Sequence, residues 1–115
     1  MSEPRDTTAQ LVNVDALQAY LAAALPGAEQ DGELRVERIR GGHSNETFYI
    51  TRGAGPLEER YVLRRPPLGP LLPTAHDVGR EYRVLSALAG TPVPVPHPVL
   101  FCDDASVLGA PFYLM

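Results

Sequence analysis

The sequence has very few of the features that mark secreted or membrane proteins. It contains one cysteine, Cys102, and a lone thiol cannot close an internal disulfide, so a reducing compartment is expected. No apolar run approaches the roughly 20 residues that a helix needs to span a bilayer. The N-terminus lacks the basic start and the apolar core of a secretory signal peptide. These absences predict a cytoplasmic protein.

Positive charge is also scarce. Ten basic residues stand against fourteen acidic ones, which gives a formal net charge of -4. A general nucleic-acid binder would usually be basic, so neither nucleic acid nor a membrane is expected as a partner. The net charge does not exclude one local basic patch, formed by Arg60, Arg64 and Arg65. The 115 residues, 44% of them hydrophobic and 21% charged, fit one globular domain.

The first 25 residues predict a leader followed by one helix. Residues 1–12 have the composition of a flexible polar leader, and residues 13–115 are taken as one lobe. Asn13 or Asp15 can cap a helix that runs to about Leu25, where a Pro-Gly pair stops it. The apolar residues of this helix share one stripe, which predicts that it packs against a sheet: Val14, Leu17, Leu21 and Leu25.

Three strands are expected next. Leu34–Arg40 alternates in a pattern typical of a half-exposed strand. Phe48–Thr51 follows, and Arg52–Pro56 has the glycines and the proline of a turn. Tyr61–Arg64 is apolar on consecutive positions, which favours a central place in the sheet.

The rest of the chain predicts one helix and two more strands. Thr74 or Asp77 can start a helix that Gly90 ends. Its buried stripe is expected at Val78, Tyr82, Leu85 and Leu88. An extended proline-rich linker follows over residues 91–98, and then strands over 99–102 and 111–115. The turn between these strands is expected at Asp103, Asp104, Ala105 and Gly109.

The sum is an α+β fold: a five-stranded antiparallel sheet with one packed helix and an extra N-terminal helix. The last strand runs to the final residue with no cap and no polar tail. We therefore expect the chain to be a piece of a longer protein.

A glycine-led turn separates the first two predicted strands and is the first candidate for a binding site. Gly41 and Gly42 lack Cβ atoms, so the backbone can bend tightly and bring several N–H groups to a phosphate. Ser44 and Thr47 add hydroxyl donors, and Asn45 can brace the turn through its own backbone. His43 lies in the same turn and can touch a ligand. An ordinary hairpin turn explains the two glycines equally well.

Two charged residues complete the candidate site. In the third strand Val62 and Arg64 share a face, so a ligand there would meet an apolar side chain and then a guanidinium that suits phosphate. Glu81 lies at the border of the second helix's apolar stripe, where it needs a partner such as Arg64. The alternatives are a solvated strand-edge arginine and a surface glutamate paired with Arg80 or Arg83.

These motifs, in this order, resemble the N-lobe of the aminoglycoside phosphotransferase family, which has a protein-kinase-like fold. The resemblance covers about residues 30–115 and is nearest to the phosphotransferase-like domain linked to acyl-CoA dehydrogenases. The segments that carry it are 41–47, 61–67, 76–88, 93–96 and 111–115. Arginine stands at position 64 where most kinases have lysine.

The resemblance implies a role for each matching position. Residues 41–47 would cover the phosphates of ATP, Val62 would touch adenine, and Met115 would lie just before the hinge between lobes. Arg64 and Glu81 would form the strand–helix ion pair of kinases. The implied cofactor-binding residues are Gly41, Gly42, His43, Ser44, Asn45, Thr47, Val62, Arg64, Glu81 and Met115. No residue of this chain is assigned to catalysis or to a metal.

The implied activity needs a second lobe. Kinases take a catalytic-loop Asp and Asn and a magnesium-binding Asp from a C-lobe, which this sequence does not include. We therefore expect a nucleotide-binding lobe of an ATP- and Mg²⁺-dependent small-molecule phosphotransferase, inactive by itself, with the C-lobe and an unknown acceptor as partners. Two alternatives remain: a binding module of kinase-like shape without catalysis, and a structural fragment that binds no ligand.

Overall fold

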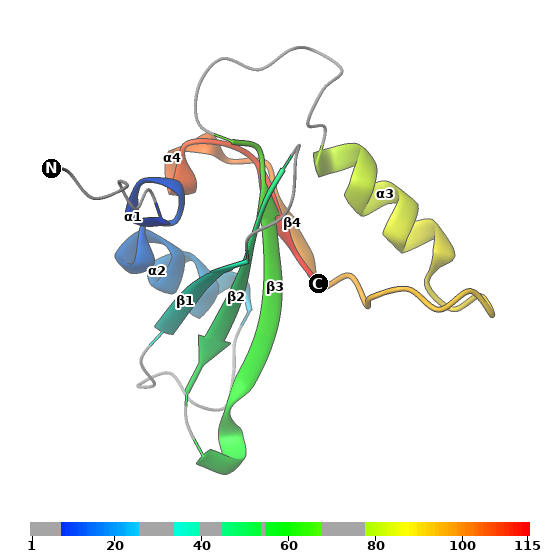
Figure 1. The fold of residues 1–115 in the computed structure, drawn as a ribbon, viewed down its shortest axis with the longest axis horizontal. Coiled ribbons are helices and arrows are strands. Elements are labelled where there is room, and N and C mark those ends of the chain that lie inside the picture. The colour runs from blue at the N-terminus through cyan, green and yellow to red at the C-terminus, as the bar shows by residue number, and fades with distance from the viewer. Residues whose placement is uncertain (1–7, 26–33, 40–44, 54, 68–77) are drawn as a thin grey trace, which may run out of the picture.

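A computed structural model describes residues 8–25, 34–39, 45–53, 55–67 and 78–115. The strands form one antiparallel sheet in the order β1-β2-β3-β5-β4 (Figure 1). They are β1 Leu34–Ile39, β2 Glu46–Arg52, β3 Glu59–Arg65, β4 Leu100–Cys102 and β5 Phe112–Leu114. The predicted α+β fold with a five-stranded antiparallel sheet is confirmed, and β3 takes the central place that its sequence favours.

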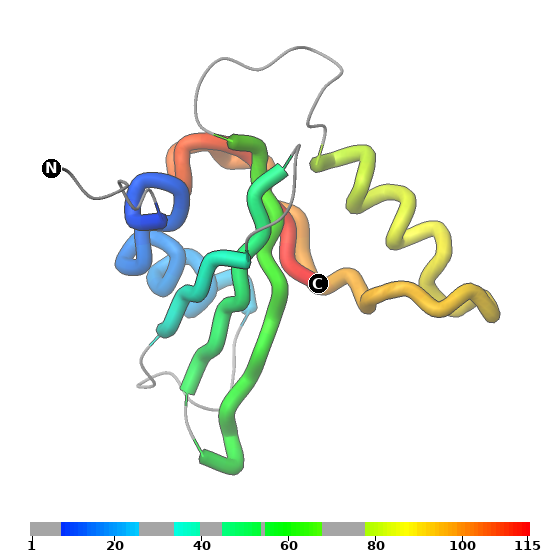
Figure 2. The backbone as a smooth tube through the Cα atoms, viewed as in Figure 1, coloured from blue at the N-terminus to red at the C-terminus, as the bar shows by residue number. Residues whose placement is uncertain are grey.

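The helices lie on opposite sides of this sheet. Figure 2 shows α1 Thr8–Leu11, α2 Val14–Ala24 and α4 Ala105–Leu108 together on one side, and α3 Val78–Leu88 on the other. A short 3-10 helix, Gly55–Leu57, joins β2 to β3. Among the described residues no helix is long and apolar enough to cross a bilayer.

Strand alternation gives the sheet two chemically different faces. The core face, which α1, α2 and α4 cover, presents Phe48, Ile50, Leu63, Phe112 and Leu114. Residues that lie opposite one another in neighbouring antiparallel strands share a face. The other face is here called the site face. The register places five residues on it: Thr47, Tyr49, Val62, Arg64 and Tyr113.

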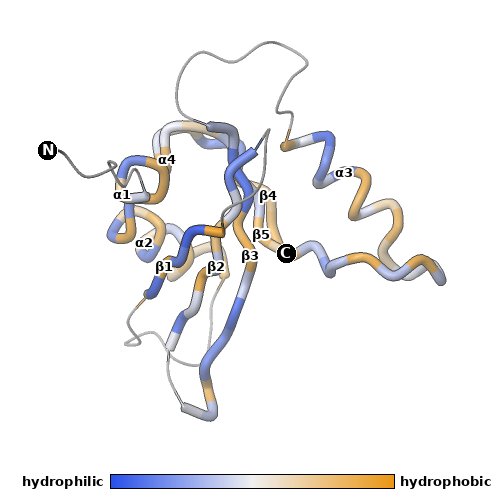
Figure 3. The backbone as a smooth tube through the Cα atoms, in the orientation of Figure 1, coloured by the Kyte–Doolittle hydropathy of each residue, from blue (hydrophilic) through white to orange (hydrophobic). Residues whose placement is uncertain are grey.

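Helix α2 forms where its capping residue and its apolar spacing predict it. The Asn13 side chain accepts a hydrogen bond from the Ala16 N–H at 3.0 Å, which satisfies one of the free donors of the first turn. Leu17 and Leu21 are almost completely buried against the sheet. The prediction that this helix packs on the sheet is confirmed, and Figure 3 shows its apolar positions in orange.

Residues 8–12, the last part of the segment predicted to be a flexible leader, are ordered and partly buried. Thr8–Leu11 is a helical turn, and Leu11 and Val12 are each only 1% exposed because they pack into the core with α2. Two neighbouring apolar residues give no periodic signal, although together they remove much apolar surface from water. Residues 1–7 lie outside the described residues.

Two connections also differ from the sequence-based expectation. Glu46 and Thr47, expected in the glycine-led turn, belong to β2, because their pairing with Arg65 and Arg64 continues the ladder with β3. The turn expected between β4 and β5 holds the short helix α4. Asp104 caps this helix by accepting from the Ser106 N–H at 2.9 Å.

Helix α3 covers only part of the site face. Its expected first residues, Thr74 and Asp77, lie outside the described residues, and Gly90 follows its last turn with a φ of 83°. Of the predicted stripe only Val78 is buried, whereas the other three members are half-buried. The reason is that α3 packs on β5 and borders an open hollow. Figure 3 shows a hydrophilic first half of α3 and an apolar second half.

Candidate functional site

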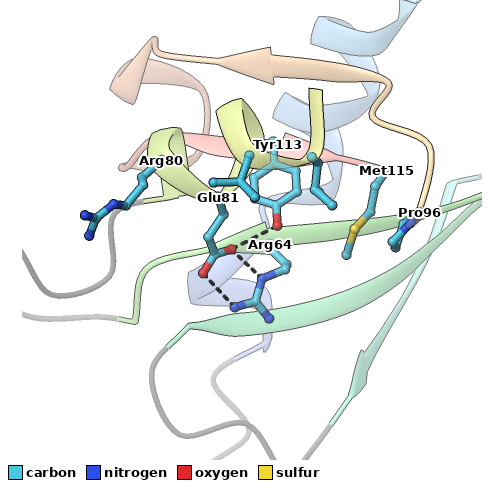
Figure 4. Close-up of a pocket in the computed structure, with 8 residues that line it drawn as sticks. Arg64, Arg80, Glu81, Pro96, Tyr113 and Met115 are labelled. Carbon is cyan, nitrogen blue, oxygen red and sulfur yellow. Dashed lines mark hydrogen bonds and ion pairs between the residues drawn. The ribbon is translucent and has the colours of Figure 1, made fainter. Parts of the chain in front are cut away.

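The site face carries a row of three polar side chains beneath the first turn of α3. The register places Thr47 opposite Arg64, and Arg64 opposite Tyr113, so the row crosses β2, β3 and β5. Glu81 descends from α3 onto this row (Figure 4). Three strands and α3 therefore contribute side chains to one site.

Both oxygens of Glu81 accept two hydrogen bonds. Oε1 accepts from Arg64 Nε at 2.8 Å and from the Tyr113 hydroxyl at 2.9 Å. Oε2 accepts from Arg64 Nη2 at 3.0 Å and from Asn45 Nδ2 at 2.7 Å. The pairing of Arg64 with Glu81 that the sequence predicts is therefore confirmed as a contact, and the surface pair of Glu81 with Arg80 or Arg83 is not what forms.

The charges of this cluster stabilise one another. Burial raises the pKa of Glu81, but hydrogen bonds from Arg64, Tyr113 and Asn45, with the charge of Arg64, outweigh it, so the pKa lies below its usual value. The hydrogen bond to Glu81 raises the pKa of Arg64, against the effect of burial. Burial and the bond to Glu81 raise the pKa of Tyr113. Near neutral pH Glu81 is an anion, Arg64 a cation, and Tyr113 a neutral donor.

Arg64 keeps donors for a further ligand. A guanidinium has five N–H groups, and the bonds to Glu81 and Thr47 use three of them, on Nε, Nη2 and Nη1. The Thr47 hydroxyl accepts from Nη1 at 2.7 Å. Within the described residues, one N–H on each terminal nitrogen has no acceptor. The Arg64 side chain is 24% exposed, so these two donors can meet an anion.

Asn45 acts differently from the prediction that it braces its own turn. Its side chain donates to Glu81, because an ionised carboxylate is a stronger acceptor than a neighbouring backbone carbonyl. The residue is 5% exposed, and its Oδ1 has no hydrogen-bond partner in the described part of the chain.

The other predicted residues divide into two groups. Gly41, Gly42, His43 and Ser44 lie outside the described residues. Val62 and Met115 exchange two backbone hydrogen bonds of 2.9 Å, which fix the end of β5 beside β3.

Two hollows open on the site face, and Met115 lines both. The first, of about 480 Å³, lies between α3 and β5 and includes Arg64, Glu81 and Tyr113 in its lining. The second, of about 460 Å³, lies over β1, β2 and β3 and includes Tyr49 and Val62. The Arg64–Glu81 pair, here called the ionic end of the site face, lines the first hollow, whose surface is otherwise mostly apolar. The second hollow combines Tyr49 and Val62 with the charged Glu37 and Arg60.

The basic patch that the charge balance did not exclude is not formed by Arg60, Arg64 and Arg65. Arg65 faces the core, is 3% exposed, and donates to the carbonyl oxygens of Pro66, Leu11 and Leu108 at 2.6 to 3.1 Å. Arg60 is exposed and pairs with Glu58 at 2.9 Å. The alternation of β3 separates Arg64 from Arg65, so only Arg64 reaches the site.

Tyr113 is the site residue that the sequence analysis missed. The sequence places it only in the strand over residues 111–115, but its hydroxyl donates to Glu81 Oε1. The alternation of β5 indicates that Tyr113 faces away from Phe112 and Leu114. Its place beside Arg64 depends on the pairing of β3 with β5, which local sequence does not reveal.

Comparisons with known proteins agree with this architecture. The sequence profile of the family described as "Phosphotransferase enzyme family" matches residues 35–115. The chain is 48% identical over 102 residues to "Acyl-CoA dehydrogenase family member 11" of Gallus gallus, covering 87% of this chain and 13% of that protein. It is 41% identical over 121 aligned positions to the Rattus norvegicus protein of that name, covering 100% and 15%.

A plant relative is similar to the same extent. The chain is 43% identical over 103 residues to "Probable acyl-CoA dehydrogenase IBR3" of Arabidopsis thaliana, covering 88% of this chain and 12% of that protein. The chain thus spans 12–15% of the length of these three relatives. No solved structure matches it significantly. Its fold and its sequence show that the chain belongs to the phosphotransferase enzyme family.

Proposed function

We propose that this chain is the N-terminal, nucleotide-binding lobe of an ATP-dependent phosphotransferase. In the full-length protein it would help to move the γ-phosphoryl group of ATP to a hydroxyl group of a small molecule. The observation that carries the proposal is the Arg64–Glu81 pair. The Glu81 carboxylate binds the Nε–Nη2 edge of the Arg64 guanidinium, and an N–H donor remains on each terminal nitrogen.

The phosphates would bind at the ionic end of the site face. The two remaining donors of Arg64, one on each terminal nitrogen, lie in the plane of the guanidinium, which suits oxygens of one phosphate or of neighbouring phosphates. Glu81 balances the charge of Arg64, so the guanidinium is held in place before the ligand arrives. The glycine-led residues Gly41–Ser44 precede Asn45 directly, and we propose that their backbone N–H groups cover the phosphates.

The base would bind over the second hollow. Tyr49 lies opposite Val62 in the register, and half of Tyr49 is exposed, so both offer apolar surface to a flat heterocycle. Met115 borders the same hollow. The distance along β3 from Val62 to Arg64 is two residues, or about 7 Å, which suits the separation of a nucleoside from its phosphates.

Mg²⁺ would accompany the nucleotide, but the described residues do not fit it. Magnesium needs oxygen ligands with free lone pairs, and both Glu81 oxygens already accept two hydrogen bonds each. In the described ranges no three His, Cys, Asp or Glu side chains gather as metal ligands. We propose that the metal ligands, the catalytic Asp and Asn and the acceptor site belong to a C-lobe, and that these 115 residues alone are inactive. We also propose that the protein is cytoplasmic, where ATP is available.

The proposal is tested by titrating the ¹⁵N-labelled chain with Mg-ATP and following the amide signals. We expect saturating shifts at millimolar nucleotide around residues 41–47, Val62 and Arg64, because half a cleft binds weakly. Arg64→Ala should abolish saturation, whereas Arg83→Ala, an exposed arginine of α3, should not. Equal shifts in both variants, or no shifts at all, would reject the nucleotide site and favour a binding module without ATP.

A further inference from the structure

The Tyr113 hydroxyl occupies a place that packing alone does not explain. The residue is 2% exposed, and its ring packs against Tyr82 with a centroid distance of 5.6 Å. A phenylalanine would fill the same space without a polar atom to satisfy. The hydroxyl instead donates to Glu81 Oε1, the oxygen that also accepts from Arg64 Nε.

The orientation of the Glu81 carboxylate decides which donors Arg64 has left. A carboxylate can bind a guanidinium along the Nε–Nη2 edge or along the terminal Nη1–Nη2 edge. In this structure Glu81 takes the Nε–Nη2 edge. A carboxylate on the terminal edge would occupy the donors that a phosphate needs, and the ligand would have to compete with it.

We propose that Tyr113 is a positioning residue that selects the first of these two arrangements. Its hydroxyl holds Oε1 on the Nε side of Arg64, and the Asn45 side chain donates to Oε2. With both oxygens fixed, Glu81 cannot rotate onto the terminal edge, and that edge stays open to the ligand. This inference rests on the proposed function only in naming the ligand as a nucleotide phosphate.

The first test needs no ligand. The Arg64 Nε–H signal is followed by ¹⁵N NMR in the unmodified chain and in Tyr113→Phe, which keeps the ring. We expect a single, slowly exchanging signal in the unmodified chain and a shifted, rapidly exchanging one in the variant. Tyr82→Phe is the matched control, because it removes a hydroxyl from the same aromatic cluster and no bond from Tyr82 to Glu81 is present. An unchanged Arg64 signal in Tyr113→Phe would overturn the inference.

The second test adds Mg-ATP. We expect Tyr113→Phe to bind it about 3- to 10-fold more weakly, which corresponds to one hydrogen bond of ordinary net strength. In a Glu81→Gln background the same change should add no further loss, because Tyr113 acts through Glu81. A similar loss in that background would contradict the positioning role.

The outcomes separate the two proposals. If the unmodified chain binds no ATP, the nucleotide site fails, while the Arg64 signal still decides the role of Tyr113. If Tyr113→Phe does not fold, the role of Tyr113 is tested in the unmodified chain by measuring how fast the Tyr113 hydroxyl proton exchanges with water. Slow exchange of that proton with water supports the bond to Glu81, and fast exchange overturns the inference.

Discussion

Arg64 and Arg65 are neighbours in β3, yet they have opposite surroundings and opposite uses. Arg65 is buried, and its guanidinium donates to three carbonyl oxygens, two of which lie at the ends of α1 and α4. Burial lowers its pKa. Arg64 is partly exposed, is paired with a carboxylate that raises its pKa, and keeps two N–H donors. Because side chains alternate along the strand, Arg65 connects core elements, whereas Arg64 lies on the site face, where we propose that it contacts a ligand.

The comparison teaches that charge alone does not mark a binding residue. Arg65 uses Nε and Nη1 to bind three backbone carbonyls and is only 3% exposed, so a ligand cannot reach it, although it is as cationic as its neighbour. A guanidinium that is held along one edge is both fixed and available. Exposure, together with the kind of acceptor that each guanidinium binds, distinguishes the two arginines.

Replacing Arg65 should have the largest effect on stability. In Arg65→Ala the carbonyls of Leu11 and Leu108 lose their donor while they stay buried, and we expect a loss of about 3 kcal/mol in the free energy of unfolding. Urea unfolding followed by circular dichroism measures it. Arg64→Ala should cost no more than about 1 kcal/mol, because its ion pair is partly exposed. Equal losses would erase the distinction between the two arginines.

A smaller effect is expected where the chain leaves α4 toward β5. Gly109 has a φ of 92°, and an added Cβ would meet no atom within 4 Å, so the cost of a side chain is backbone strain alone. Gly109→Ala should lower the free energy of unfolding by about 1 kcal/mol. Gly109→Asn should lower it less, since Asn tolerates this conformation better. If both variants were as stable as the parent, the position of Leu108 above Arg65 would not depend on this turn.

The smallest stability effect belongs to the site face and depends on pH. The pKa of Glu81 is lowered in the fold from its ordinary value of 4.5, so its contribution is present above that value and is lost as pH falls through the folded pKa. Glu81→Gln should cost at most about 1 kcal/mol at pH 7, because the pair is partly exposed, and this cost should vanish once the pH has fallen below the folded pKa.

Chemical unfolding at several pH values tests this dependence. Glu37→Gln serves as the control, because Glu37 is exposed on β1. A Glu81→Gln deficit that stayed constant from pH 7 to pH 3 would show that the carboxylate's charge does not stabilise the fold.

The sequence was sufficient for the features that depend on local patterns. Asn13 and the spacing of Leu17 and Leu21 predict α2 with its cap and its buried face. The order of a glycine-led turn, a strand ending in Arg64 and a helix carrying Glu81 predicts the ion pair. These signals are local or follow from a resemblance that fixes the order of the elements.

The features that failed depend on contacts between distant segments. Tyr113 joins the site because β5 pairs with β3, and Arg65 is buried because α1 and α4 end above it. Asn45 turns to Glu81, 36 residues further along the chain. None of these distances can be read from periodicity, and polar residues that bridge distant elements carry no pattern of their own.

The most direct test of the central claim compares the binding of ATP with that of adenosine by titration calorimetry. Arg64→Ala should weaken ATP binding at least ~10-fold, as expected for lost hydrogen bonds between charged groups, and leave adenosine binding unchanged. Arg83→Ala should alter neither. If Arg64→Ala bound ATP as tightly as the unmodified chain, or lost ATP and adenosine equally, Arg64 would not be the phosphate contact and the account would be wrong.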